Sequence, residues 1–146
     1  MIKPSLKGTE RVIKVFSNPK IIGRKLEPNY LDLLTKELYD FIAFDAQYSI
    51  FTLTKPEDEI FDIRKNELLY LERNIIIKIC QIYLKDQVVL SENNSILLDI
   101  LSDVIVNLMI SLIKSYNNKP TYVTIIRKSI IEYYNIIFNF AESLHD

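Results

Sequence analysis

Glycine, cysteine, histidine and tryptophan are scarce in this chain, whose 146 residues include two glycines, one cysteine, one histidine and no tryptophan. Two glycines exclude a glycine-rich phosphate-binding loop and a dinucleotide-binding fingerprint, because both motifs need several glycines at fixed spacing. A β-sandwich or barrel is also disfavoured, since its short strands are usually joined by glycine-containing turns. A single cysteine cannot form a disulfide within the chain, so we expect an intracellular location, in the cytoplasm or an organelle interior.

Metal-binding and nucleophilic residues are correspondingly few. Structural zinc sites need several Cys and His ligands at close spacing, and Cys80 and His145 cannot supply them. Glu142 and His145 have the Glu-x-x-His spacing that di-iron helical bundles carry twice, but this sequence has it once. Cys80 lies in an apolar stretch, which is typical of a buried small side chain and not of a nucleophile. We therefore expect no metal, no cofactor and no catalytic residue.

The commonest residue types point to an A/T-rich genome. Ile, Asn, Lys, Tyr and Phe are encoded by A/T-rich codons, and together they make up 64 of the 146 residues. Such genomes occur in viruses, organelles, plasmids, parasites and low-GC bacteria. Individual isoleucines and tyrosines therefore carry little information about function.

Charge divides the chain at about residue 25. Residues 1–25 hold seven basic residues and one acidic residue, a net charge of +6, whereas residues 26–146 have a net charge of −7. Short β-branched clusters and a turn at residues 17–19 predict that residues 1–25 form an extended basic arm before a single helical domain. The candidate partner- or phosphate-binding residues of the arm are Lys3, Lys7, Arg11, Lys14, Phe16, Lys20, Arg24 and Lys25.

Residues 26–146 show the apolar spacing of amphipathic helices. Four helices are expected to begin near Asn29, Thr54, Asn94 and Pro120. The fourth has the most regular spacing, with apolar residues at alternating steps of three and four: Val123, Ile126, Ile130, Tyr133, Ile137, Phe140 and Leu144. Amphipathic helices joined by short links predict an all-α, four-helix up-down bundle.

The start of the second helix carries the clearest local signal. Thr54 and Glu57 have the spacing of a capping box, and Pro56 is tolerated in a first helical turn. The second helix is therefore expected over residues 54–85. Residues 48–54 alternate loosely and contain threonine and aromatic side chains, so a short strand there is possible, and the segment could equally be the end of the first helix.

The longest apolar run, residues 96–113, contains Asp99 and Asp103. Their spacing of four places them on one stripe of a helix, which predicts an amphipathic helix and not a membrane span. Buried together, the two carboxyls could raise each other's pKa and serve acid–base chemistry. A solvated stripe is the interpretation we favour, and a polar contact surface for a partner helix is a third.

Together these features predict a non-enzymatic protein, which acts in protein–protein interaction or as an assembly subunit. A viral protein that binds a host factor and an accessory subunit of a larger complex both fit, and the partner is another protein or a second copy. The arm could bind a neighbouring protein as an added strand, fold back on the acidic body, or bind nucleic-acid phosphates. An enzyme with a carboxylate site is the weakest alternative. Candidate helix-face contacts are Tyr133, Ile137, Phe140, Asp99 and Asp103.

Overall fold

The structure is a computed structural model that describes residues 12–18, 26–48, 50–55, 57–84 and 92–144. These residues contain no β-strand and form a helical bundle, which confirms the all-α prediction. A short helical turn at residues 12–16, the N-terminal turn, comes first. The helices that follow are α2 (Pro28–Tyr48), α3 (Ile50–Leu53), α4 (Glu59–Tyr83), α5 (Glu92–Lys114) and α6 (Pro120–Ser143).

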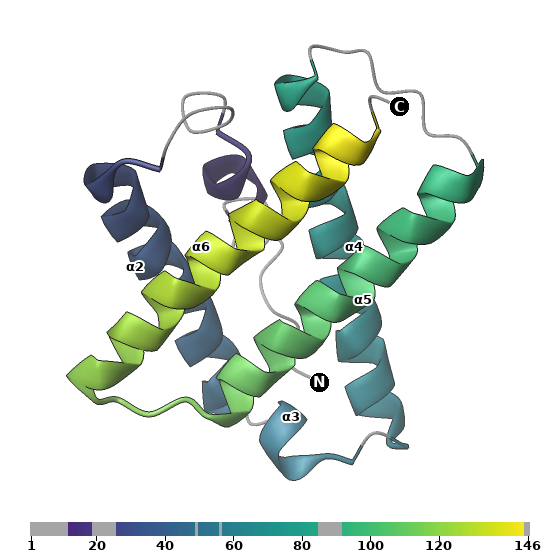
Figure 1. Cartoon of the computed structure of the whole chain (residues 1–146). Coiled ribbons are helices and arrows are strands. Elements are labelled where there is room, and N and C mark those ends of the chain that lie inside the picture. Colours follow the sequence, from purple (N-terminus) through teal and green to yellow (C-terminus); the bar gives the residue numbers. More distant parts are fainter. Residues whose placement is uncertain (1–11, 19–25, 49, 56, 85–91, 145–146) are drawn as a thin grey trace.

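The four long helices form two crossed layers. In Figure 1, α5 and α6 lie in front and cross α2 and α4 behind them. Both α2 and α4 pack on both α5 and α6, and the largest shared contacts are α4 with α5 and α2 with α6. An up-down bundle, in which each helix packs on the next along the chain, is therefore not the arrangement found. Among the long helices, α4 and α5 are the one pair that follow each other in the chain and also pack extensively on each other.

Helix α3 occupies the segment for which either a short strand or the end of the first helix was expected, and the strand alternative is wrong. Thr54 donates its backbone N–H to the carbonyl of Ile50 at 3.1 Å, a helical hydrogen bond within the segment. Phe51 is 1% exposed, and its ring meets the ring of Phe61 edge-on at 5.0 Å between centroids. The aromatic residue that favoured a strand instead anchors a helical turn against α4.

Helix α4 starts later than predicted, at Glu59, with Asp58 as the N-cap residue. The Thr54 hydroxyl donates to the carbonyl of Ile50, so it ends α3 and does not cap α4. The Asp58 carboxylate accepts a hydrogen bond from the backbone N–H of Lys55 at 2.7 Å and closes a turn between the two helices. The capping-box prediction is therefore wrong, whereas the starts of α5 and α6 lie within two residues of their predicted positions.

The hydrophobic core lies between the two layers. The second half of α4 supplies its centre, because Ile75, Ile76 and Ile79 are each 0% exposed. Every other long helix contributes fully buried aliphatic residues, including Leu34, Ile42, Leu98, Ile105, Ile113, Ile126, Ile130 and Ile137. Burial of aliphatic side chains, at about 25 cal/mol per Å² of apolar surface, is the main force that holds the layers together.

The N-terminal turn also belongs to this core. Residues 12–16 are helical and not extended as predicted for the arm, and Val12 and Phe16 are 5% and 3% exposed. In Figure 1 the turn lies between α2 and α4 in the rear layer. Part of the predicted arm thus folds against the acidic body through apolar packing.

Candidate functional site

The predicted arm residues fall into two groups. Lys14 is exposed on the N-terminal turn, whereas the Phe16 ring is buried against α6. Phe16 fills the protein's own core in this arrangement, and its role as a partner contact stays a prediction. The other arm candidates lie outside the described residues: Lys3, Lys7, Arg11, Lys20, Arg24 and Lys25.

The predicted contact face of α6 is largely interior. Tyr133 is 6% exposed and Ile137 is 0% exposed, so both side chains pack inside the bundle, and their contact with a partner stays a prediction that this arrangement does not favour. Most of the regularly spaced apolar residues of α6 face the rear layer, whereas Val123 is 37% exposed. Phe140 is partly buried and packs against the core.

A carboxyl group is buried beside these aromatic side chains. Glu72 on α4 is 2% exposed, and the Tyr133 hydroxyl donates a hydrogen bond to its Oε2 at 2.9 Å. Burial raises the pKa of Glu72 to about 7, although the hydrogen bond from Tyr133 lowers it in part. Burial also raises the pKa values of Tyr133 and Tyr134, so both phenols keep their protons while Glu72 titrates.

Phe16 and Tyr134 extend this cluster to the N-terminal turn. The Phe16 ring stacks on Tyr134 at 6.2 Å between centroids and meets Tyr133 edge-on at 5.6 Å. The Tyr134 hydroxyl donates to the backbone carbonyl of Phe16 at 2.7 Å. Sequence reasoning missed Glu72, although its position four residues after Leu68 puts a carboxyl on the buried stripe of α4.

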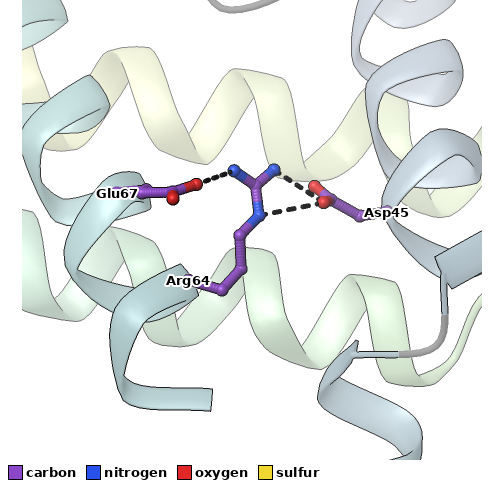
Figure 2. Close-up of polar contacts among 3 residues, drawn as sticks. All are labelled: Asp45, Arg64 and Glu67. Carbon is purple, nitrogen blue, oxygen red and sulfur yellow. Dashed lines mark hydrogen bonds and ion pairs between the residues drawn. The ribbon is translucent and has the colours of Figure 1, made fainter. Parts of the chain in front are cut away.

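A second buried polar cluster joins the end of α2 to the start of α4 (Figure 2). The Arg64 guanidinium donates through Nε and Nη2 to Asp45 Oδ1 at 3.0 and 2.6 Å, and through Nη1 to Glu67 Oε2 at 2.9 Å. Arg64 and Asp45 are 4% and 2% exposed, and the guanidinium lies 5.8 Å from the centroid of the Phe41 ring. No signal in the sequence pairs Asp45 with Arg64, because they lie on different helices.

Burial dominates the electrostatics of Asp45. It raises the pKa of this carboxyl above its ordinary value, although the positive charge of Arg64 and its hydrogen bonds lower it in part. Asp45 Oδ2 is buried and makes no hydrogen bond within the described part of the chain. The cluster is therefore an ion pair between α2 and α4. One oxygen of its Asp45 carboxylate has no hydrogen-bond partner among the described residues.

Neither cluster combines a nucleophile with a base. Cys80 is buried, as predicted, and burial raises the pKa of its thiol to about 11, so the thiol stays protonated near neutral pH. No group of three or more His, Cys, Asp or Glu side chains that could hold a metal ion occurs among residues that the structure describes. His145 lies outside those residues.

The two aspartates of α5 are separated by their partners. Asp99 forms an ion pair with Arg73 at 3.0 Å, and Asp103 forms one with Lys65 at 3.4 Å. Their side chains are 67% and 49% exposed, whereas the acid–base interpretation required them to be buried together. Asn107 donates to Asp103 Oδ2 at 3.2 Å, so the polar residues follow one solvated stripe.

Beside this polar stripe, α5 exposes a row of aliphatic side chains that we call the α5 row. Ile96, Leu97, Ile100 and Val104 are 55%, 49%, 56% and 52% exposed. Steps of four along a helix make Ile96, Ile100 and Val104 neighbours on its surface. Large contiguous apolar patches are uncommon on monomeric proteins and mark sites of interaction, whereas single exposed apolar residues are ordinary. Sequence reasoning predicted the solvated polar stripe of this helix and missed the row of exposed aliphatic residues beside it.

Helix α5 is also long and apolar enough, by length and composition, to cross a membrane over Asn94–Lys114. In the bundle, 44% of its most apolar stretch is buried. The core helix of a soluble protein passes the same test of length and composition. That the chain has no membrane span stays a prediction.

The fold and its two polar clusters define an all-α bundle with an exposed aliphatic face. Comparison with protein families, with curated proteins and with solved structures finds no match to this chain.

Proposed function

We propose that the protein is a non-enzymatic interaction or assembly subunit that binds another protein through the α5 row. The observation that carries this proposal is the exposure of four neighbouring aliphatic side chains, each about half exposed, on one helix. A protein surface gains free energy by covering such a row, at about 25 cal/mol per Å² of apolar area removed from water.

The edge of the row favours a protein as the occupant. The ion pairs Arg73–Asp99 and Lys65–Asp103 border the row on the side of α4. An apolar centre with a polar rim is the usual anatomy of a protein interface. The simplest complementary surface is an amphipathic helix whose aliphatic residues repeat every three or four positions.

The test compares two exposed isoleucines. Ile100→Glu places a charge in the centre of the α5 row, and Ile131→Glu makes the same change on α6, where Ile131 is 44% exposed. Both variants should keep the fold, because substitutions on an exposed helix surface usually change stability by less than about 0.5 kcal/mol. Tagged full-length proteins are expressed in the native cells, cross-linked and recovered, and the partners are quantified by mass spectrometry.

We expect a partner that is bound by the unaltered protein and by Ile131→Glu but is lost with Ile100→Glu. Equal recovery with both variants, or equal loss, would rule out the α5 row as the binding site. Sedimentation equilibrium of the purified chain gives the second control. If Ile100→Glu abolishes self-association of the chain, a second copy binds the α5 row, and the proposal that a different protein binds there is wrong.

A further inference from the structure

The N-terminal turn rests on a buried ionisable group. Phe16 covers Tyr133 edge-on, and the Tyr133 hydroxyl in turn donates a hydrogen bond to the Glu72 carboxyl at 2.9 Å. The turn is held to α6 by the Phe16 ring and by the hydrogen bond from Tyr134 to the Phe16 carbonyl. A helical turn of five residues thus lies over a carboxyl that is shut off from water.

We propose that the buried Glu72 carboxyl acts as a pH-dependent latch for residues 12–16, which stay docked while it is protonated and are released when it ionises. A neutral carboxyl accepts the hydrogen bond from Tyr133 and needs no further compensation. A carboxylate in the same place has lost most of its hydration, and a single hydrogen bond from a phenol compensates little of that loss. Undocking the turn exposes the aromatic pair and lets water reach the charge.

Among the residues that the structure describes, no positively charged group holds the Glu72 carboxylate. On α6 the ionisable groups beside it are the phenols of Tyr133 and Tyr134. On the N-terminal turn the ionisable group is Lys14, whose side chain is exposed. On α4 itself, Lys65 and Arg73 form their ion pairs with aspartates of α5. None of the ion pairs seen in the described segments includes Glu72.

The turn is the element that should move. It has five residues, whereas α4 and α6 have 25 and 24 and share the core with two other helices. Short segments with few buried contacts open at lower free energy than long core helices.

Hydrogen exchange of the full-length protein tests the latch. Amides of residues 12–18 are followed by mass spectrometry between about pH 5.5 and 8.5, and the rates are corrected for intrinsic exchange. If the pKa of Glu72 falls from about 7 to its ordinary 4.5 on release, protection should decrease by up to about 30-fold across this range. Amides in the second half of α4 serve as the internal control and should keep their protection.

Two variants distinguish the latch from general loosening. Glu72→Gln keeps a hydrogen-bonding group of the same shape and has no charge to develop, so protection of residues 12–18 should become independent of pH. Tyr133→Phe removes a hydrogen bond that lowers the pKa of Glu72, so the midpoint of release should move to higher pH. Protection that is constant in the unaltered protein, or that falls equally in Glu72→Gln, would overturn the proposal.

If a variant does not fold, the latch can still be tested on the unaltered protein. The carbon-13 chemical shift of the Glu72 carboxyl is measured as a function of pH. The titration midpoint of Glu72 should coincide with the midpoint of lost protection in residues 12–18. Two midpoints more than about one pH unit apart would show that another group controls the turn. The latch does not depend on the α5 row, so either proposal can fail without the other.

Discussion

Glu72 and Asp45 show two ways in which one buried carboxyl can be held. Asp45 receives two hydrogen bonds from the Arg64 guanidinium, whereas Glu72 receives one from a neutral phenol. Burial raises the pKa of both carboxyls, and the opposing effect of a positive charge is present at Asp45 alone. The two sites should therefore respond differently when a charge is removed.

Replacing Glu72 by Gln should stabilise the protein above neutral pH. In the folded protein the pKa of Glu72 is raised from 4.5 to about 7, so its stabilising contribution is complete below about pH 4.5 and is lost as pH rises through 7. The variant does not lose this contribution, and its free energy of unfolding should exceed that of the parent by up to about 3 kcal/mol at pH 8.

Urea unfolding of the parent and of Glu72→Gln at several pH values, followed by circular dichroism, measures this difference. The gap between the two proteins should widen from about pH 4.5 to 7 and then stay constant. Parallel profiles over the whole range would show that Glu72 has an ordinary pKa in the folded protein.

Removing the charge of Arg64 should strongly destabilise the fold. Arg64→Met leaves Asp45 buried without its partner, and breaking a buried pair in this way typically costs about 3–5 kcal/mol. The double variant Arg64→Met, Asp45→Leu removes both charges and should recover most of the loss. Chemical denaturation of both variants provides the measurement, and a double variant as unstable as the single one would contradict the prediction.

At the scale of helices, the connection between α3 and α4 depends on Asp58. Its carboxylate accepts the Lys55 N–H and lies at the positive end of α4. Asp58→Ala should therefore lower the free energy of unfolding by about 1 kcal/mol, because it removes one hydrogen bond to a backbone N–H and a favourable charge at the helix start. Glu57→Ala, one residue away and exposed, is the matched control and should change it by less than about 0.5 kcal/mol.

Thermal unfolding of these two variants also decides between the two descriptions of this helix start. The sequence pattern assigns the cap to Thr54 and Glu57, whereas the structure assigns it to Asp58. A larger effect from Glu57→Ala than from Asp58→Ala would favour the pattern. Several acidic residues follow one another here, so spacing alone cannot say which carboxylate closes the turn.

Helix existence could be predicted from the sequence, and helix partners could not. The three-and-four spacing of α6 correctly marks Ile126, Ile130 and Ile137 as apolar positions, and all three are 0% exposed. The same spacing does not show what covers them, so Tyr133 and Ile137 were assigned to a partner when α2 and α4 cover that face. Apolar periodicity predicts which face of one helix is buried. The angle at which the layers cross, and so which helices cover that face, depends on side chains from several helices.

The buried polar groups were the least predictable part of the candidate site. Asp45 and Arg64 lie on separate helices, and only the folded chain brings them within 2.6 Å. Glu72 did carry a signal, because it interrupts an apolar stripe, yet its partner Tyr133 lies 61 residues further along the chain. Side-chain pairs of this kind become visible when the packing of the layers is known.

For the whole molecule, the rate at which Cys80 reacts can measure how often the interior of the bundle opens. Its thiol is 2% exposed and, with a pKa of about 11, stays protonated in the folded state. An alkylating reagent should therefore modify it at the rate at which the bundle opens and not at the rate of the free thiol. Because the chain has no second cysteine, each molecule takes up one label, and the mass distribution over time counts opened and unopened molecules directly.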